Sequence, residues 1–315
     1  MPATAKTCSP SRLSASTFVR PPQISAHETM ASRRCFLKRS AGVLLISGVG
    51  GSLLSACGGG NLSDDSPATP RLASVSNFRD VAGAAPYPTV DGRQMRRGVF
   101  YRANVLTLDA ADQATIDRLG IASVYDLRTP AEIARTADIL PGGATAQTLN
   151  VLGTADFVAP ALDTAAAAVA FMEAQARGYV TGTAQRAAYG GLLTSLADGA
   201  GAQLLHSSAG KDRAGWVAAL LLSIANVPLD VIMRDYLLSN VYLAPWIKAQ
   251  TDALRAQAGD AVASARAPLL SVQENYLQAG FDQVQASYGT MSSYLTRGLG
   301  LSQRTIDTLQ SRLVI

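Results

Sequence analysis

One ten-residue run holds most of the residue types that could do chemistry: His206-Ser207-Ser208-Ala209-Gly210-Lys211-Asp212-Arg213-Ala214-Gly215. It follows a short apolar run, 203–206, and precedes an apolar stretch, 215–224, which predict a strand and a helix. In that context successive backbone N–H groups can surround an anion, with the positive end of the helix dipole behind them. Arg213 adds a planar guanidinium that can bind two oxygens of one phosphate. We therefore expect this run to bind a phosphate dianion.

The flanking patterns predict an α/β sheet. Residues 108–119 read as a helix that ends at Gly120, because glycine accepts a left-handed cap. The apolar run 121–127 reads as a buried strand with charged groups at its carboxyl end. Strands that lead through loops into helices are typical of sheets that bind ligands at the carboxyl ends of their strands. The segments 161–197 and 228–314 are mostly helical in pattern, long enough to cover the sheet and to leave helices over as a lid.

The positive charge of the chain is concentrated at its amino end. Residues 1–56 hold seven of the 27 Lys and Arg residues but one of the 23 acidic residues. The rest of the chain has a net charge of about −2 and lacks the basic surplus that binds nucleic acid, so we exclude that partner class. A hydrophobic content of 48% and a charged content of 16% also exclude a disordered chain and a polytopic membrane protein.

Residues 30–56 resemble an export signal. Ser32-Arg33-Arg34-Cys35-Phe36-Leu37-Lys38 matches the twin-arginine signature, and an apolar run too short to span a bilayer follows at 41–54. Leu54-Ser55-Ala56-Cys57 resembles a lipobox, which predicts acylation of Cys57. We expect twin-arginine export and a lipid anchor in the cell envelope, at the periplasmic or outer membrane face. The alternative is an ordinary cleaved signal with an incidental cysteine, and residues 1–29 read as an over-extended start.

The rest of the chain divides into a tether and one domain. Residues 57–70 combine the lipidated cysteine with a polar, glycine-rich tether that would span about 20 Å. Residues 71–315 show no repeat and no second linker. Once Cys8 and Cys35 leave with the leader and Cys57 is acylated, no thiol remains, and His206 is the one remaining histidine. We therefore expect no disulfide, no zinc site, no metal, no cofactor and no Ser-His-Asp triad that needs a second imidazole.

The 206–215 run is similar to the signature loop of bacterial secreted tyrosine phosphatases, His-Cys-x-x-Gly-Lys-Asp-Arg-Thr-Gly. Four further motifs fall in the order of that family: Asn77-Phe78-Arg79-Asp80, Tyr101-Arg102, Asp126-Leu127-Arg128 with Glu132, and Asp235-Tyr236-Leu237-Leu238. The resemblance covers about residues 72–314. It implies a tyrosine-phosphatase-like α/β fold, in which helices flank a central, mostly parallel sheet. A helical lid or insertion and a helical carboxyl-terminal part complete that fold.

The resemblance also implies roles for individual residues. Ser207 stands at the position of the nucleophile, Asp212 at that of the general acid, and Arg213 at that of the phosphate-binding arginine. Phosphate contacts would come from Arg213 and the loop residues Ser208, Ala209, Gly210 and Lys211. Supporting residues would be His206, Arg79, Asp80, Asp126 and Arg128.

Structural alternatives stand beside several of these roles. Arg79 and Asp80 would either support the loop or form a surface turn. Arg128 would either contact substrate or pair with Asp126 or Glu132 inside the protein. Lys211 would either add positive charge for a phosphoinositide or a flanking phosphate, or lie solvated on the loop. Two aromatic residues in helical apolar patterns, Trp216 and Tyr236, are expected in the core.

Two departures from the family pattern bear on activity. Ser207 replaces the cysteine, and Ala214 replaces the hydroxyl residue after the arginine. A serine hydroxyl is a far weaker nucleophile than a thiolate and needs an adjacent base. We therefore expect binding of phosphotyrosine, phosphoserine or phosphoinositide, with impaired dephosphorylation. One alternative is a pseudophosphatase that captures phosphorylated proteins or lipid headgroups without hydrolysis, and another is an envelope interaction protein with a decayed site.

Overall fold

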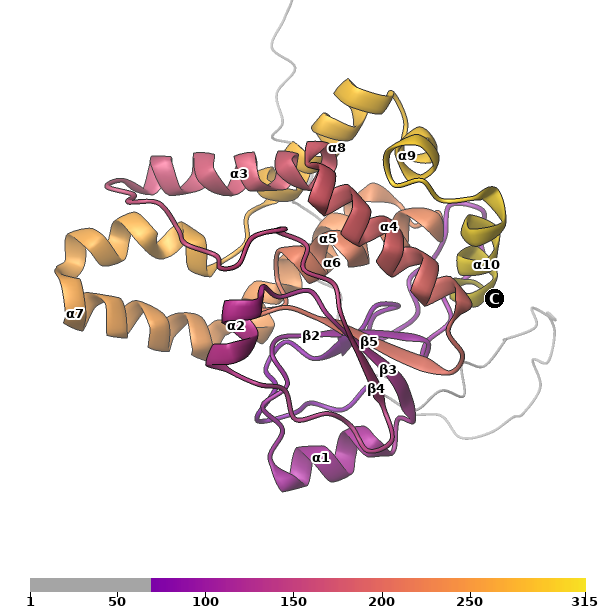
Figure 1. Ribbon diagram of the computed structural model, residues 1–315, viewed down its shortest axis with the longest axis horizontal. Coiled ribbons are helices and arrows are strands. Elements are labelled where there is room, and N and C mark those ends of the chain that lie inside the picture. Colours follow the sequence, from indigo (N-terminus) through magenta and orange to yellow (C-terminus); the bar gives the residue numbers. More distant parts are fainter. Residues whose placement is uncertain (1–68) are drawn as a thin grey trace, which may run out of the picture. The chain divides into compact units, whose positions relative to one another are not determined.

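A five-stranded sheet forms the centre of the computed structural model, which describes residues 69–315 (Figure 1). The predicted leader, Cys57 and nearly all of the tether lie outside the described residues. The strand order is β1-β2-β5-β3-β4, with β1 antiparallel to β2 and the other pairs parallel. The strands are β1 (Arg79–Asp80), β2 (Phe100–Ala103), β3 (Ile121–Asp126), β4 (Thr145–Thr148) and β5 (Ala202–His206). This arrangement confirms the mostly parallel α/β sheet and places β5, which leads into the 206–215 run, at its middle.

Alternating side chains of the central strands supply two cores, one on each face of the sheet. Leu204 of β5 and Tyr101 of β2 belong to one core, together with residues of α1 (Ala110–Asp117). The adjacent residues, Leu205 and Phe100, belong to the other core. Because successive side chains of a strand point to opposite faces, both faces of β5 are covered and its position is fixed.

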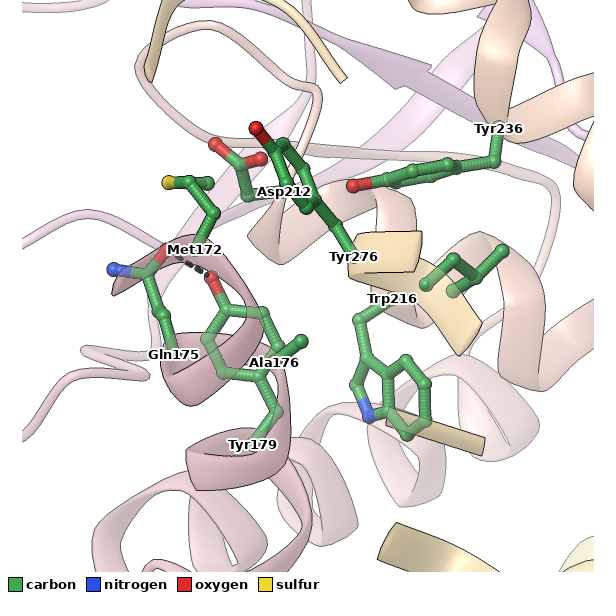
Figure 2. Close-up of a pocket in the computed structure, with 9 residues that line it drawn as sticks. Met172, Gln175, Ala176, Tyr179, Asp212, Trp216, Tyr236 and Tyr276 are labelled. Carbon is green, nitrogen blue, oxygen red and sulfur yellow. Dashed lines mark hydrogen bonds between the residues drawn. The ribbon is translucent and has the colours of Figure 1, made fainter. Parts of the chain in front are cut away.

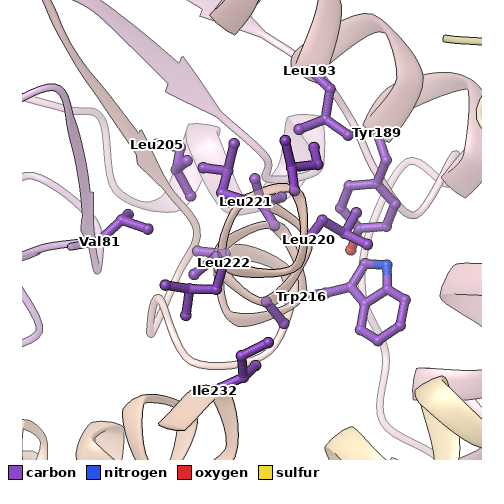
Figure 3. Close-up of a cluster of buried hydrophobic side chains, with 14 of the residues drawn as sticks. Val81, Tyr189, Leu193, Leu205, Trp216, Leu220, Leu221, Leu222 and Ile232 are labelled. Carbon is purple, nitrogen blue, oxygen red and sulfur yellow. The ribbon is translucent and has the colours of Figure 1, made fainter. Parts of the chain in front are cut away.

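Helix α5 (Arg213–Ile224) is buried along almost its whole length. Eleven of its 12 residues are buried, which suits a helix that is apolar on all sides. Figure 3 shows α5 end-on, with Leu205 of β5, Leu193 of α4 and Ile232 of α6 around it. The amino end of α5, where the 206–215 run joins it, is therefore held by a packed core.

The remaining helices confirm the predicted helical segments 161–197 and 228–314 and add α2, which the sequence analysis did not predict. They are α2 (Pro130–Arg135), α3 (Ala165–Thr181), α4 (Thr183–Asp198), α6 (Leu229–Tyr242), α7 (Ala244–Leu270), α8 (Glu274–Tyr288), α9 (Met291–Ser293), the π-helical turn Tyr294–Gly298 and α10 (Gln303–Leu313). Helix α7 is broken at Gly259, whose φ of 83° is not helical, and α3 packs against both α7 and α8. Within residues 69–315, no helix is long and apolar enough to cross a membrane.

Element boundaries differ from the sequence prediction by a few residues. The helix predicted over 108–119 spans 110–117, because the Asp109 side chain caps its first turn. The helix predicted from Gly215 begins two residues earlier, at Arg213. Sequence reasoning missed β1, β2 and β4. Strand β1 has two residues, and β4 has no buried side chain, so neither carries an apolar pattern.

Candidate phosphate-binding site

The loop between β5 and α5 has bonded carbonyl groups and free N–H groups. The carbonyl of His206 accepts a hydrogen bond from the Leu127 N–H (3.0 Å), and that of Ser208 accepts one from the Val105 N–H (3.2 Å). Within residues 69–315, none of the seven backbone N–H groups from 207 to 213 donates a hydrogen bond. Because interior N–H groups nearly always have a partner, these donors at a helix N-terminus indicate an anion site.

Gly210 allows the loop to approach the end of β2 closely. Its φ is 67°, a conformation that favours glycine. A Cβ atom at this position would lie 2.1 Å from the carbonyl oxygen of Ala103. The glycine of the motif is therefore required by the conformation of the loop and by its contact with the sheet.

Arg213 lies at the first position of α5, and the Glu132 carboxylate fixes its guanidinium. The Nη1 and Nη2 atoms of Arg213 each lie 2.7 Å from one oxygen of Glu132, and Nη1 also donates to the Leu127 carbonyl (3.2 Å). The Nε–H group of Arg213 has no partner within residues 69–315, and Nη2 lies 3.4 Å from the Ser208 hydroxyl. Two oxygens of one phosphate could bind the edge formed by Nε and Nη2 if Nη2 exchanged its long hydrogen bond to Ser208 for a phosphate oxygen.

Glu132 joins three parts of the site. It belongs to the capping box that begins α2 with Thr129, and it accepts a hydrogen bond from the Ser208 hydroxyl (2.5 Å). Burial opposes ionisation of Glu132, but its hydrogen bonds and the charge of Arg213 outweigh burial and lower its pKa from 4.5 to about 2. Sequence reasoning gave Glu132 no role toward Arg213, although Thr129-x-x-Glu132 signals a helix start after a strand.

Lys211 and Asp212 pair with each other at the amino end of α5. The Lys211 ammonium lies 2.8 and 3.0 Å from the Asp212 carboxylate oxygens and 3.3 Å from the Ser271 carbonyl after α7. Because Lys211 is 3% exposed, it is not a solvated loop lysine. Figure 2 shows Asp212 in a narrow crevice beside Tyr276 and Tyr236, so this acid candidate has an aromatic surrounding.

His206, Asp126 and Arg128 form a buried ionic cluster beside the loop. The Arg128 guanidinium bonds both oxygens of Asp126 (2.9 and 2.8 Å) and one oxygen of Asp138 (2.7 Å). Arg128 therefore forms an internal ion pair with Asp126, as one of the two interpretations of the sequence predicted. Glu132, the other partner considered for Arg128, pairs with Arg213 instead. The imidazole Nε2 of His206 lies 3.2 Å from Asp138, a partner that sequence reasoning missed.

The same cluster is the part of residues 69–315 that could hold a metal. Ligand atoms of Asp126, Asp138 and His206 lie within 4.8 Å of one another. Burial opposes ionisation of Asp138, but His206 and Arg128 lower its pKa. Because Arg128 already bonds both carboxylates, a cation would have to displace a guanidinium that matches them in charge and shape.

Arg79 and Asp80 have different surroundings. Arg79 is 3% exposed, and its guanidinium donates to Asn77 (2.5 Å), whose amide in turn donates to the Ala209 carbonyl of the loop (2.9 Å). Arg79 thus belongs to the loop's surroundings and is not part of a surface turn. Asp80, also buried, accepts hydrogen bonds from the Ala82 and Gly98 N–H groups, which orders the turns after β1.

Comparison with known proteins agrees with this geometry. Residues 70–315 match the tyrosine phosphatase family. The chain belongs to this family. It is 31% identical over 282 residues to the triple specificity protein phosphatase PtpB of Mycobacterium tuberculosis, which covers 77% of this chain and 98% of that protein. A tyrosine-protein phosphatase of Nostoc commune is 28% identical over 273 residues, covering 80% of this chain and 90% of that protein.

Ser207 in this member of the tyrosine phosphatase family lies at the start of the loop and is 2% exposed. Within the described residues its hydroxyl forms no hydrogen bond, and neither nitrogen of His206 contacts it as a hydrogen-bond partner. A serine in this position thus has no adjacent base. Ala214 is fully buried in the first turn of α5 and supplies no hydroxyl.

A hollow of about 560 Å³ adjoins the phosphatase loop on the side of Ser208 and Glu132. Phe157 from the segment before α3 and Trp246 from α7 contribute aromatic side chains to its wall. The first of these segments is tied to α2 by two hydrogen bonds between Arg135 and Asp156 (2.9 and 2.7 Å). Sequence reasoning missed both aromatic residues because only the tertiary fold brings them to the loop.

The two aromatic residues expected in the core are buried. Trp216 is 1% exposed and Tyr236 is 5% exposed. Both rings also line the crevice beside Asp212, and Trp216 packs against Phe281 of α8 with ring centroids 5.6 Å apart. Their role as core residues is confirmed, and the same rings form part of the site's surroundings (Figure 2).

Proposed function

We propose that this tyrosine phosphatase family member binds phosphomonoesters in the 206–213 loop and hydrolyses them slowly. The free N–H groups from 207 to 213 are the observation that carries the proposal, because they supply donors that nothing else in residues 69–315 uses. The Nε–Nη2 edge of Arg213 would hold two further oxygens, with Glu132 fixing its orientation.

The same geometry explains why turnover should be slow. In the family reaction at this site, the Ser207 oxygen would bond to phosphorus, the ester bond would break, and Asp212 would donate a proton to the leaving alcohol. The Ser207 hydroxyl proton would need an acceptor, and its hydroxyl has no base among the described residues. The product would be a phosphoserine ester, and water must be activated to hydrolyse it.

The surroundings of the loop favour an aromatic phosphomonoester such as phosphotyrosine. Phe157 and Trp246 offer ring surfaces beside the loop, in a hollow large enough for an aryl group. Lys211 is committed to Asp212 and Ser271, which argues against a free charge for a polyanionic phosphoinositide. Phosphoserine and phosphoinositide remain part of the proposal because the loop N–H groups and Arg213 would bind the phosphate group that all three substrates share.

Capture without hydrolysis is the second candidate, and Ser207 is the observation that favours it. A loop that keeps its donors but lacks the thiolate would bind a phosphorylated protein and release it unchanged. We further propose that the chain is exported by the twin-arginine route and anchored through Cys57 in the cell envelope. The sequence patterns at 32–38 and 54–57 support this location.

An aryl phosphate assay of the wild type beside Ser207→Cys tests the proposal. We expect the cysteine variant to turn over more than ten times faster, because its thiol ionises near neutral pH. Arg213→Ala in the same background should abolish phosphate binding and turnover. A wild-type rate within tenfold of the cysteine variant would refute the impairment. Turnover by neither form, with phosphate still bound, would favour capture without hydrolysis.

A further inference from the structure

Behind the loop lies a buried charged cluster formed by Arg79, Arg102 and Asp235. These residues are 3%, 0% and 1% exposed, respectively. Asp235 of α6 lies 3.2 Å from Nη1 of Arg102 and 3.5 Å from Nε of Arg79, so one carboxylate serves two guanidinium groups. The cluster therefore carries a formal charge of +1 inside the protein. Burying charge costs free energy, so such a cluster calls for an explanation.

The cluster bonds carbonyl groups of the loop from the side away from the free N–H groups. Nη2 of Arg102 donates to the Gly210 carbonyl (2.7 Å) and approaches that of Lys211 (3.4 Å). The amide of Asn77, itself bonded by Arg79, donates to the Ala209 carbonyl (2.9 Å). Three consecutive carbonyl groups of the loop are thus fixed by two buried side chains.

Fixing a carbonyl also fixes the N–H group of the same peptide. The peptide unit is planar and trans, so its C=O and N–H bonds point in opposite directions. The carbonyls of Ala209, Gly210 and Lys211 belong to the peptides whose N–H groups are those of Gly210, Lys211 and Asp212. These three N–H groups are among the free donors at the front of the loop. Bonds made behind the loop therefore aim the donors in front of it.

The charge and the packing of Arg102 also suit a residue that orients the loop peptides. Burial and the nearby charge of Arg79 lower the pKa of Arg102 from 12.5 to about 9, although Asp235 opposes this. The cation would be stabilised further by an anion bound on the other side of the loop. Packing leaves little freedom, because a Cβ atom at Gly215 would lie 3.1 Å from Nη2 of Arg102 and 3.0 Å from the Tyr236 ring.

We propose that Arg102 and Asn77 are positioning residues for the phosphate loop, with Asp235 as the counter-ion that keeps Arg102 in place. The proposal rests on the proposed phosphate binding. Arg102 and Asn77 touch no substrate atom; they hold the loop peptides so that the donors converge before the ligand arrives. Buried positive charge behind the loop adds to the attraction of the helix dipole for a dianion.

Titration of the full chain with sodium tungstate, a tetrahedral oxyanion, tests the proposal by calorimetry. We expect Arg102→Lys to bind tungstate about 10- to 100-fold more weakly, because a lysine cannot bond Asp235 and the loop carbonyls together. Asn77→Ala removes one carbonyl contact and should weaken binding about threefold to tenfold. This second variant keeps the test decisive if Arg102→Lys fails to fold.

Arg312→Lys is the matched control. Arg312 also bonds three backbone carbonyls, those of Leu196, Gly199 and Gly201, but at the amino end of β5. It should lower the melting temperature and leave the tungstate affinity within twofold of the wild type. Unchanged affinity in Asn77→Ala and in folded Arg102→Lys would overturn the positioning role alone. A wild type that binds no tungstate would overturn the proposed function together with it.

Discussion

Replacing Glu132 with glutamine removes the negative charge that fixes Arg213 and keeps the shape of the side chain. Breaking a buried ion pair costs about 3–5 kcal/mol when the remaining charge is left uncompensated. Glutamine still offers one oxygen to Arg213, which reduces the expected loss. The lowered pKa gives a second figure: a change from 4.5 to about 2 corresponds to at most about 3 kcal/mol, and water in the adjoining hollow screens part of it. We expect unfolding free energy to fall by about 2 kcal/mol at pH 7.

The pH dependence separates this charge effect from a packing effect. The pKa of Glu132 is lower in the folded state, so its contribution is fully present above about pH 4.5 and disappears as the pH falls through about 2. The difference between wild type and Glu132→Gln should therefore shrink by roughly 40% between pH 7 and pH 3.5. Urea unfolding followed by circular dichroism measures this difference.

Asp156→Asn is the matched control for Glu132→Gln. Asp156 also makes two bonds to an arginine, Arg135, but the two side chains are 34% and 57% exposed. Exposed pairs contribute about 0–1 kcal/mol, so this substitution should have a small effect. Equal losses in the two variants, or a Glu132→Gln loss that does not change with pH, would refute the assignment of Glu132 as the partly buried, charged partner of Arg213.

Three further substitutions test separate parts of the structure. Gly210→Ala should lower the free energy of unfolding by more than about 2 kcal/mol and abolish tungstate binding, because the φ of Gly210 is 67° and a Cβ would meet the Ala103 carbonyl. Gly92→Ala is the control, since Gly92 has a φ of 81° with open space around it, and thermal unfolding should show a loss of about 1 kcal/mol. Trp246→Ala should weaken binding of an aryl phosphate about tenfold and leave tungstate affinity unchanged in paired titrations, and equal changes would exclude Trp246 as an aryl contact. Gly280→Ala should lower the free energy of unfolding by about 1–3 kcal/mol, since a Cβ would lie 2.6 Å from the Trp216 ring; an unchanged melting temperature would contradict this close packing of α8 on Trp216.

Local signals in the sequence were sufficient for the parts of the fold that surround the loop. The apolar runs at 121–127 and 203–206, followed by Gly210 and the helix at 215–224, predicted a strand-loop-helix unit, and that unit is present. The prediction of this unit was correct because the strand pattern, the turn glycine and the helix pattern agree with one another. The sequences of strands β2 and β4 lack such agreeing local signals, so these strands can be recognised only from their pairing in the folded sheet.

The partners inside the site depended on tertiary contacts. Sequence reasoning placed Arg213 at the phosphate and could not connect it with Glu132, which lies 81 residues away in the chain. The contact between Arg102 and Gly210 joins residues 108 apart. Such pairs have no periodic signature, because charge pairing across a fold depends on how strands are ordered in the sheet. The order of the motifs in the sequence therefore predicts which segments belong to the site, and the contacts between their side chains depend on the fold.

The most direct test of phosphate binding is a crystal structure of the full chain soaked in tungstate. The account predicts strong anomalous density inside the 206–213 loop, with oxygens within hydrogen-bond distance of several backbone N–H groups and of the Nε–Nη2 edge of Arg213. An empty loop at saturating tungstate, or tungstate bound only elsewhere on the protein, would contradict it.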